Sequence, residues 1–206
     1  ITPLLVLGFG IDIRYAMGAA LCSVIATSSG AAVAYLRDGV SNLRIGLFLC
    51  VATTIGAVCG ALMATSLSQS LLAIIFGTAL LGTVLLSLRK RNESPLLPAD
   101  SDPLALRLDL PGEMPGTGVN VPYGVAGVIP GFCVMWVAGV LSGLLGIGSG
   151  AFKVLAMDQI MRLPFKVTTA TSNFMIGVTA AASVGIYLKK GYLDPALMSP
   201  VALGIL

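Results

Sequence analysis

The chain has 206 residues, of which 56% are hydrophobic and only 10% are charged, and its mean hydropathy is +0.97. A soluble domain carries roughly a quarter charged residues, so this composition lacks the polar surface that a water-soluble fold requires. The formal net charge of +3 comes from short clusters of Lys and Arg between long apolar runs. Such a pattern is typical of membrane topology and gives no indication of nucleic-acid binding.

Residues suited to metal or redox chemistry are scarce. Histidine is absent, and the cysteines lie isolated in apolar stretches without CxxC spacing: Cys22, Cys50, Cys59 and Cys133. Isolated cysteines in such surroundings usually behave as small hydrophobic residues. A membrane enzyme would need His or a cluster of carboxylates at membrane depth, where Asp158 is the one acidic candidate. We therefore predict no metal, no cofactor, no catalytic residue and no enzyme activity.

Apolar runs long enough to cross a bilayer recur along the chain. A spanning helix needs about 20 apolar residues. Five runs meet this requirement, at residues 15–36, 44–65, 69–88, 124–145 and 167–188, and a sixth begins near residue 196. The sequence therefore predicts an all-α fold, a polytopic bundle of transmembrane helices.

A hydrophilic segment divides the chain into two membrane parts. Between residues 89 and 123, Pro, Gly, Asp and Glu replace the apolar pattern and oppose helix continuation. We predict a first transmembrane repeat at 1–88, an aqueous loop at 89–123 and a second transmembrane repeat at 124–206. A solvated linker is the favoured interpretation of the loop, and a regulatory or partner-docking role remains the alternative.

The two membrane parts resemble each other. A shift of 152 positions aligns five identical or like-charged pairs without a gap: Arg14 with Lys166, Tyr35 with Tyr187, Leu36 with Leu188, Arg37 with Lys189 and Gly39 with Gly191. A shared hydropathy profile accompanies these pairs. Together they predict an internal duplication.

Two apolar segments are too short to span the membrane. Residues 1–9 and 151–163 reach only about 15–20 Å as helices, against a hydrocarbon core near 30 Å. They occupy matching places in the two repeats, and paired short segments of this kind indicate the binding site of a transporter. Each repeat then has an odd number of spans, which predicts that the second repeat is inverted relative to the first.

This topology places more Lys and Arg residues on one side of the membrane than on the other. One side receives Arg37, Arg44, Arg89, Lys90, Arg91, Arg107, Arg162 and Lys166, and the other receives Arg14, Lys189 and Lys190. Positive residues concentrate on the cytoplasmic side of membrane proteins. We therefore predict that loop 89–123 is cytoplasmic.

The second short segment contains the first candidate site. Glycines at 143, 146, 148 and 150 interrupt the apolar run, and Lys153 follows. Glycines allow a sharp turn and close approach to a ligand, and the free N–H groups of a half-helix beginning at membrane depth attract an anion. Close helix packing is the alternative role of the glycines. For Lys153 the alternatives are snorkelling to an interface or pairing with Asp158.

Hydroxyl and amide groups form the second candidate site. Thr171, Ser172 and Asn173 lie at the head of the next apolar run, and Thr27 and Ser28 are a weaker counterpart in the first half. Such groups can bind an oxyanion without a fixed charge. Hydrogen bonding between helices is the alternative.

These segments resemble a known family. The stretches GLLGIGSGAFKV, ATSNFMIGVTAA and ALCSVIATSSGAAVAYLRDG are similar to those of the sulfite exporter TauE/SafE family of bacterial membrane permeases. The resemblance implies two homologous halves that move sulfite, organosulfonates or related sulfur-containing anions, commonly outward. It places the family's glycine turn on Gly146, Gly148 and Gly150, with Ser149 replacing a glycine, its lysine on Lys153, and its Thr-Ser pair on Thr171 and Ser172.

The prediction is thus a multi-pass transporter of small anions in the bacterial inner membrane. Its expected partners are the lipid bilayer, a small anionic substrate and a second copy of the chain. The first-half glycine turn would precede Ile1, and the last run stops after about ten residues, so the sequence looks truncated at both ends. The alternative function is a non-transporting accessory or structural membrane subunit.

Overall fold

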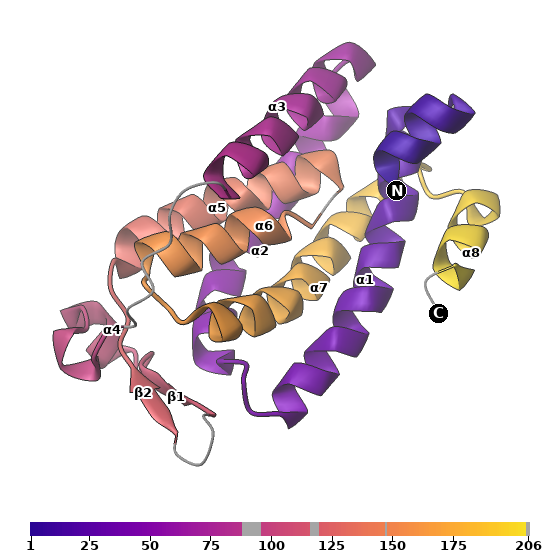
Figure 1. The fold of residues 1–206 in the computed structure, drawn as a ribbon. Coiled ribbons are helices and arrows are strands. Elements are labelled where there is room, and N and C mark those ends of the chain that lie inside the picture. Colours follow the sequence, from indigo (N-terminus) through magenta and orange to yellow (C-terminus); the bar gives the residue numbers. More distant parts are fainter. Residues whose placement is uncertain (88–95, 116–119, 147, 205–206) are drawn as a thin grey trace.

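The structure is a computed structural model in which residues 1–87, 96–115, 120–146 and 148–204 are described. It is a bundle of helices with one short hairpin at one end (Figure 1). Four of the described helices are long and apolar enough to cross a membrane: Ile13–Arg37, Leu43–Ser66, Val128–Leu145 and Phe165–Lys189. The predicted all-α transmembrane bundle is confirmed.

The described elements follow the predicted apolar runs closely. In chain order they are η1 (Leu4–Gly8), α1 (Ile13–Arg37), α2 (Leu43–Ser66), α3 (Gln69–Ser87), η2 (Pro98–Asp100), α4 (Pro103–Arg107), β1 (Gly112–Met114), β2 (Val121–Tyr123), α5 (Val128–Leu145), α6 (Gly150–Leu155), η3 (Ala156–Ile160), α7 (Phe165–Lys189) and α8 (Pro195–Leu203). β1 and β2 pair antiparallel. The two short apolar segments form η1 and the pair α6–η3.

Side-chain caps define where three of the helices begin. Asp12 accepts a hydrogen bond from the backbone N–H of Arg14 at the start of α1, and Asn42 accepts one from Ile45 at the start of α2. Asp194 accepts one from the backbone N–H of Ala196 at the start of α8. These bonds satisfy N–H groups that have no partner within the helix, which is why Asp and Asn are favoured there.

Element bounds repeat at the interval found in the sequence. Adding 152 to the bounds of η1 and α1 gives the bounds of η3 and α7, and the first residue of α2 becomes the first residue of α8. α1 and α7 pack antiparallel. Tyr187 at the end of α7 contacts Met17 near the start of α1, and Gly177 lies against Ser28 midway along both helices.

Glycines bring α2 and α5 into direct backbone contact. Gly56 and Gly60 on α2 face α5, and Gly139 and Gly143 on α5 face α2, so each helix presents a GxxxG pair to the other. A side chain at Gly60 would overlap the carbonyl oxygen of Val140. Small residues at such spacing allow van der Waals contact between backbones, which holds helices together in a membrane.

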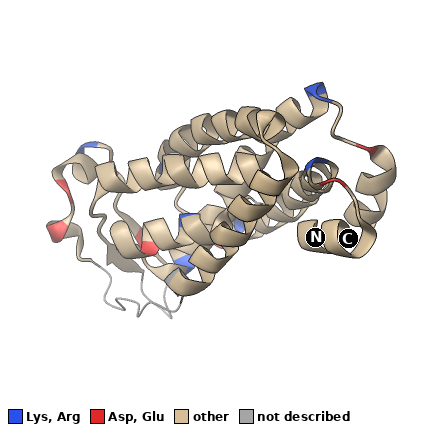
Figure 2. Cartoon of the chain, turned by 90° about the horizontal axis from the view of Figure 1, so that it is seen from above, with Lys and Arg blue, Asp and Glu red and all other residues tan. Residues whose placement is uncertain are grey.

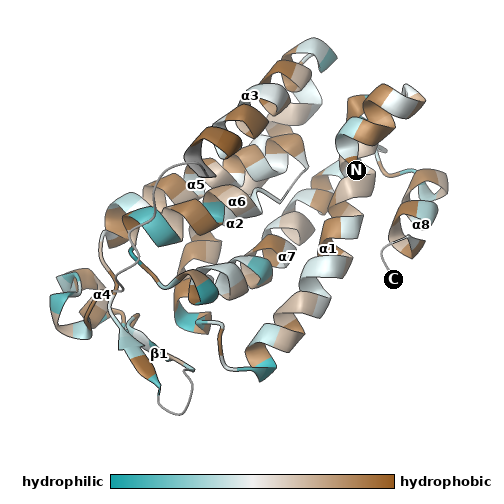
Figure 3. Cartoon of the chain, in the orientation of Figure 1, coloured by the Kyte–Doolittle hydropathy of each residue, from teal (hydrophilic) through white to brown (hydrophobic). Residues whose placement is uncertain are grey.

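Large apolar side chains cover much of the outside of the bundle. On α2, Leu47, Val51 and Ile55 are 58%, 55% and 52% exposed and lie four residues apart on one face. In Figure 3 the helices are mainly brown, with teal at their ends and in the connecting segments. Charged residues gather mainly at the helix ends and in the connections (Figure 2). This arrangement suits lipid around the bundle and water at its ends.

The predicted loop 89–123 differs from the solvated linker that its composition favoured. Its described part contains η2, α4, β1 and β2, and Ala105, Leu110 and Tyr123 are buried in the same core cluster as Ile45. The polar and turn-forming residues at the surface of this segment mask the few apolar ones that pack inward. Residues 88–95 and 116–119, including Arg89, Lys90 and Arg91, lie outside the described part of the chain.

The contact between α2 and α5 gives a first prediction. Gly60→Ala places a methyl group on the Val140 carbonyl, and overpacking of this kind costs about 1–3 kcal/mol. We expect a lower melting temperature for the purified protein in detergent. Gly82→Ala on α3 is the matched control, because a Cβ there meets nothing within 4 Å. Equal melting of both variants would contradict the packing argument.

Candidate functional site

A tight turn connects α5 to α6. Gly146 and Gly148 have φ of +63° and +73°, and Ser149 also adopts the left-handed region, at +42°. The Ser149 hydroxyl donates to the carbonyl oxygen of Ala138, 2.7 Å away, which anchors this unusual conformation to α5. The predicted sharp turn is therefore present.

The same glycines also pack closely. A Cβ at Gly146 would lie 2.8 Å from the Cβ of Met17 on α1, and one at Gly148 would lie 2.9 Å from Ile176 on α7. A Cβ at Gly150 would also meet Ile176. The turn thus packs closely between α1 and α7, so these glycines allow both the sharp turn and the tight packing.

Lys153 lies one turn into α6 and is 0% exposed. Its ammonium donates to the hydroxyl of Thr179 at 2.9 Å and to the carbonyl oxygen of Met175 at 3.4 Å. Thr179 in turn donates to Met175, and its oxygen lies 3.3 Å from that of Thr53 on α2. Complete burial excludes snorkelling to an interface. Both of these acceptors, the Thr179 hydroxyl and the Met175 carbonyl oxygen, are neutral groups.

The ammonium lies near the middle of two spanning helices. Thr53 is ten residues from the start of α2 and thirteen from its end, and Thr179 is fourteen from the start of α7 and ten from its end. At 1.5 Å per residue, each lies about 15–20 Å from either helix end. This depth matches the centre of a hydrocarbon core about 30 Å thick.

The predicted polar group on α7 lies at a different level. Thr171 accepts a hydrogen bond from the backbone N–H of Asn42, 3.1 Å away. Ser172 and Asn173 donate to the carbonyl oxygen of Thr169 within their own helix. Thr171 precedes Thr179 by eight residues, about 12 Å of helix. The structure therefore does not bring Thr171, Ser172 and Asn173 into contact with the Lys153 ammonium.

The first-half candidates are also separate from the lysine network. Thr27 is exposed and donates to the carbonyl oxygen of Ser23 within α1. Ser28 is 4% exposed and lies against Gly177. The shift of 152 positions makes Thr27 the counterpart of Thr179.

Two contributors to the lysine network were missed in the sequence. Thr53 is one hydroxyl in a long apolar run, and Met175 contributes only a backbone oxygen. Neither carries a signal of its own, because their role depends on α2, α6 and α7 meeting at one point. Thr179 lies in the same apolar run as Thr171 and Ser172, but nothing in the sequence indicates that it contacts Lys153.

The chain matches the family Sulfite exporter TauE/SafE over residues 1–206. It belongs to this family. It is 25% identical over 181 residues to the probable membrane transporter protein YunE of Bacillus subtilis (strain 168), covering 88% of this chain and 64% of YunE. It is 26% identical over 206 residues to the probable membrane transporter protein YdhB of the same organism, covering 99% of this chain and 75% of YdhB. No solved structure matches. The chain is a multi-pass membrane protein in a lipid bilayer.

The lysine network gives a second prediction. Thr179→Val removes the hydroxyl acceptor of a buried ammonium, and leaving such a group short of a partner costs about 1–3 kcal/mol. We expect a lower melting temperature in detergent. The loss should nearly vanish when Lys153→Met is already present, because the double variant has no ammonium to satisfy.

Thr78→Val is the control for this measurement. Thr78 is exposed on α3, and its hydroxyl donates within its own helix, to Ile75. If Thr179→Val is equally costly with and without Lys153, Thr179 does not act through the ammonium.

Proposed function

We propose that the chain forms a membrane transporter for small anions, with sulfite, organosulfonates and related sulfur-containing anions as its substrate class. Family membership and two relatives named as probable membrane transporter proteins support transport. The observation that carries the choice of an anion is Lys153, a fully buried lysine at mid-membrane depth held by neutral acceptors.

The physical argument rests on charge compensation. Placing a cation at the centre of a bilayer costs several kcal/mol, and ionisable residues there usually mark the path of a substrate or ion. An ammonium has three donors, and Thr179 and Met175 take two of them. An anion that accepts the third supplies the missing negative charge. The hydroxyl groups of Thr179 and Thr53 would then lie near the other oxygens of the anion.

The adjoining groups supply further donors. Gly148, Ser149 and Gly150 form the turn that leads into the helix of Lys153, and we propose that their backbone N–H groups turn toward the anion when it enters. Thr171, Ser172 and Asn173 lie about 12 Å of helix away. They would contact the anion at an earlier or later stage of its passage. Thr27 and Ser28 would do so from the first half.

Inverted repeats are part of this proposal. Helices α1 and α7 have bounds related by the 152-residue shift and pack antiparallel, which supports two repeats of opposite orientation. Alternating access would then come from movement of one repeat against the other. The excess of Lys and Arg at one end supports a cytoplasmic location for segment 89–123 in a bacterial inner membrane. A second copy of the chain is a further proposed partner.

Transport assays test the role of Lys153. The purified protein is reconstituted in liposomes, and uptake of labelled sulfite, thiosulfate and a short sulfonate is measured for the wild type and for Lys153→Gln. We expect saturable uptake to fall at least about tenfold, the effect of losing one buried charge interaction. Lys166→Gln is the matched control, since Lys166 is exposed at the start of α7, and it should retain uptake.

Two results would count against the proposal. Unchanged uptake in Lys153→Gln would remove this residue from the anion site. Absence of uptake by folded wild-type protein would favour a non-transporting accessory or structural subunit.

A further inference from the structure

The segment between the two membrane parts covers one end of the bundle. We call its described residues, 96–115 and 120–127, the cover segment. Ala126 donates to the carbonyl oxygen of Met161, at the end of η3, and Asp102 accepts from Val128 at the start of α5. Figure 1 shows α4 and the hairpin β1–β2 at the end where α2 and α7 begin. The cover segment is therefore tied to the helices on both sides of α6.

Asn42 connects the cover segment to α2 and α7 at once. Its side-chain amide donates to the carbonyl oxygen of Leu110 at 3.0 Å and to the hydroxyl of Tyr123 at 2.8 Å. Its backbone N–H donates to Thr171, and its side-chain oxygen caps α2 through Ile45. We call the three bonds to Leu110, Tyr123 and Thr171 the Asn42 latch.

The latch lies at the edge of a cavity. A space of about 300 Å³ is lined by Ser41, Asn42, Arg44, Gly112, Glu113 and Tyr123, among others. Hydrogen bonds beside such a space can be exchanged for bonds to water at small net cost, unlike bonds deep in the core. Burial raises the pKa of the Tyr123 hydroxyl, an effect that its hydrogen bond with Asn42 opposes, so this group stays neutral near pH 7.

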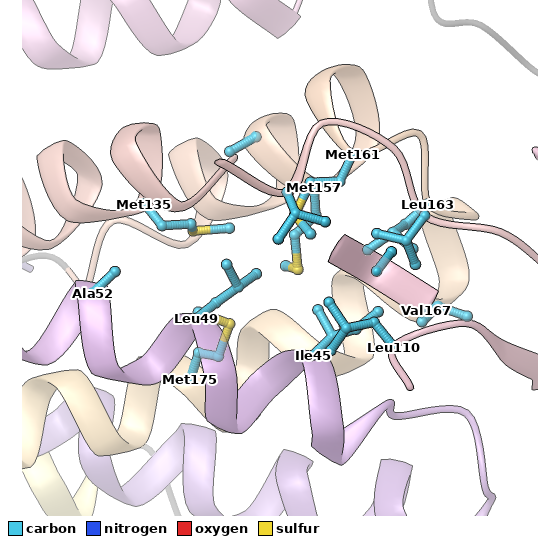
Figure 4. Packing of buried hydrophobic residues seen from close by; sticks show 14 of the residues in the cluster. Ile45, Leu49, Ala52, Leu110, Met135, Met157, Met161, Leu163, Val167 and Met175 are labelled. Atoms are coloured by element: carbon cyan, nitrogen blue, oxygen red, sulfur yellow. The ribbon is translucent and has the colours of Figure 1, made fainter. Parts of the chain in front are cut away.

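Below the latch, an apolar cluster separates this end of the bundle from the lysine network. The cluster includes Met135, Met157, Met161 and Met175, together with Leu49, and Figure 4 shows these side chains gathered between α2, α5 and the α6–η3 segment. Methionine side chains are flexible and adapt to new packing. The barrier between Lys153 and this end is thus made of groups that can rearrange.

We propose that the cover segment is the gate at this end of the transport path, and that the Asn42 latch holds it closed over Lys153. The inference rests on the proposed anion transport. Release of the latch frees the loop between α1 and α2. The cover segment can then move away from the apolar cluster that contains the four methionines. The hydrogen bond from the Asn42 backbone to Thr171 ties the same loop to α7.

Cys50 provides a natural reporter for the gate. It is 6% exposed, belongs to the same apolar cluster as these methionines, and precedes Thr53 by three residues on α2. In a background with Cys22→Ala, Cys59→Ala and Cys133→Ala, it is the single thiol in the chain. The rate at which membrane-impermeant methanethiosulfonate reagents modify Cys50 in oriented vesicles then measures opening from each side.

The test variant is Asn42→Ser. Serine still caps α2 but is too short to reach Leu110 and Tyr123. We expect modification of Cys50 to become at least about tenfold faster, and only from the side that carries the cover segment. Tyr123→Phe should accelerate it by a smaller factor, because it removes one bond of the latch. Asn120→Ser is the matched control and should leave the rate unchanged, since the side chain of Asn120 donates to Glu113 in an exposed position.

The choice of reagent separates this proposal from the proposed function. A cationic and an anionic (sulfonate) reagent should both react faster in Asn42→Ser if the latch is a gate. If Cys50 reacts faster with the anionic reagent than with the cationic one, and this difference disappears in Lys153→Gln, the result reports the anion site and not the gate. Unchanged rates for both reagents in well-folded Asn42→Ser, or equal acceleration by Asn120→Ser, would overturn the gate, whatever the uptake assays show.

Discussion

The arrangement of this protein depends on holding one ammonium group at the centre of a membrane. Lys153 sits on a short helix that begins at a turn of left-handed residues, and α2 and α7 supply the hydroxyl groups around it. A lysine on a full-length span could place its charge nearer an interface. A helix that starts at mid-membrane depth cannot do so without unwinding the turn that precedes it. The glycines of this turn therefore help to set the depth at which Lys153 lies.

The sequence predicted the parts of the fold that follow from transfer of apolar residues into lipid. Hydropathy marked the spans that became α1, α2, α3, α5 and α7, and the short runs around residues 5 and 155 became short helices. Lys153 was recognisable because a cation in an apolar run is unusual. The network that joins Lys153 to Thr179 and Thr53 could not be recognised in the sequence, because it depends on where three helices cross. Hydrophobic periodicity says little about which helices are neighbours. The packing of Leu110 and Tyr123 was hidden in the same way within a polar segment.

The duplication seen in the sequence also has limits that matter for chemistry. The 152-residue shift aligns the bounds of α1 with those of α7, yet it places Ile1 opposite Lys153 and Ala19 opposite Thr171. Equal helices therefore carry unequal side chains. The lysine and the Thr171 hydroxyl therefore have apolar residues at the matching positions of the first half.

The backbone contact between α2 and α5 has a mechanical consequence. Because glycines on both helices leave no side chains between them, neither helix can rotate or slide without driving a carbonyl group into its neighbour. This close contact joins a helix of the first membrane part to a helix of the second. Thr53 lies on α2, and Lys153 lies on the short helix that follows α5, so the hydrogen-bond network around the lysine bridges the same two membrane parts.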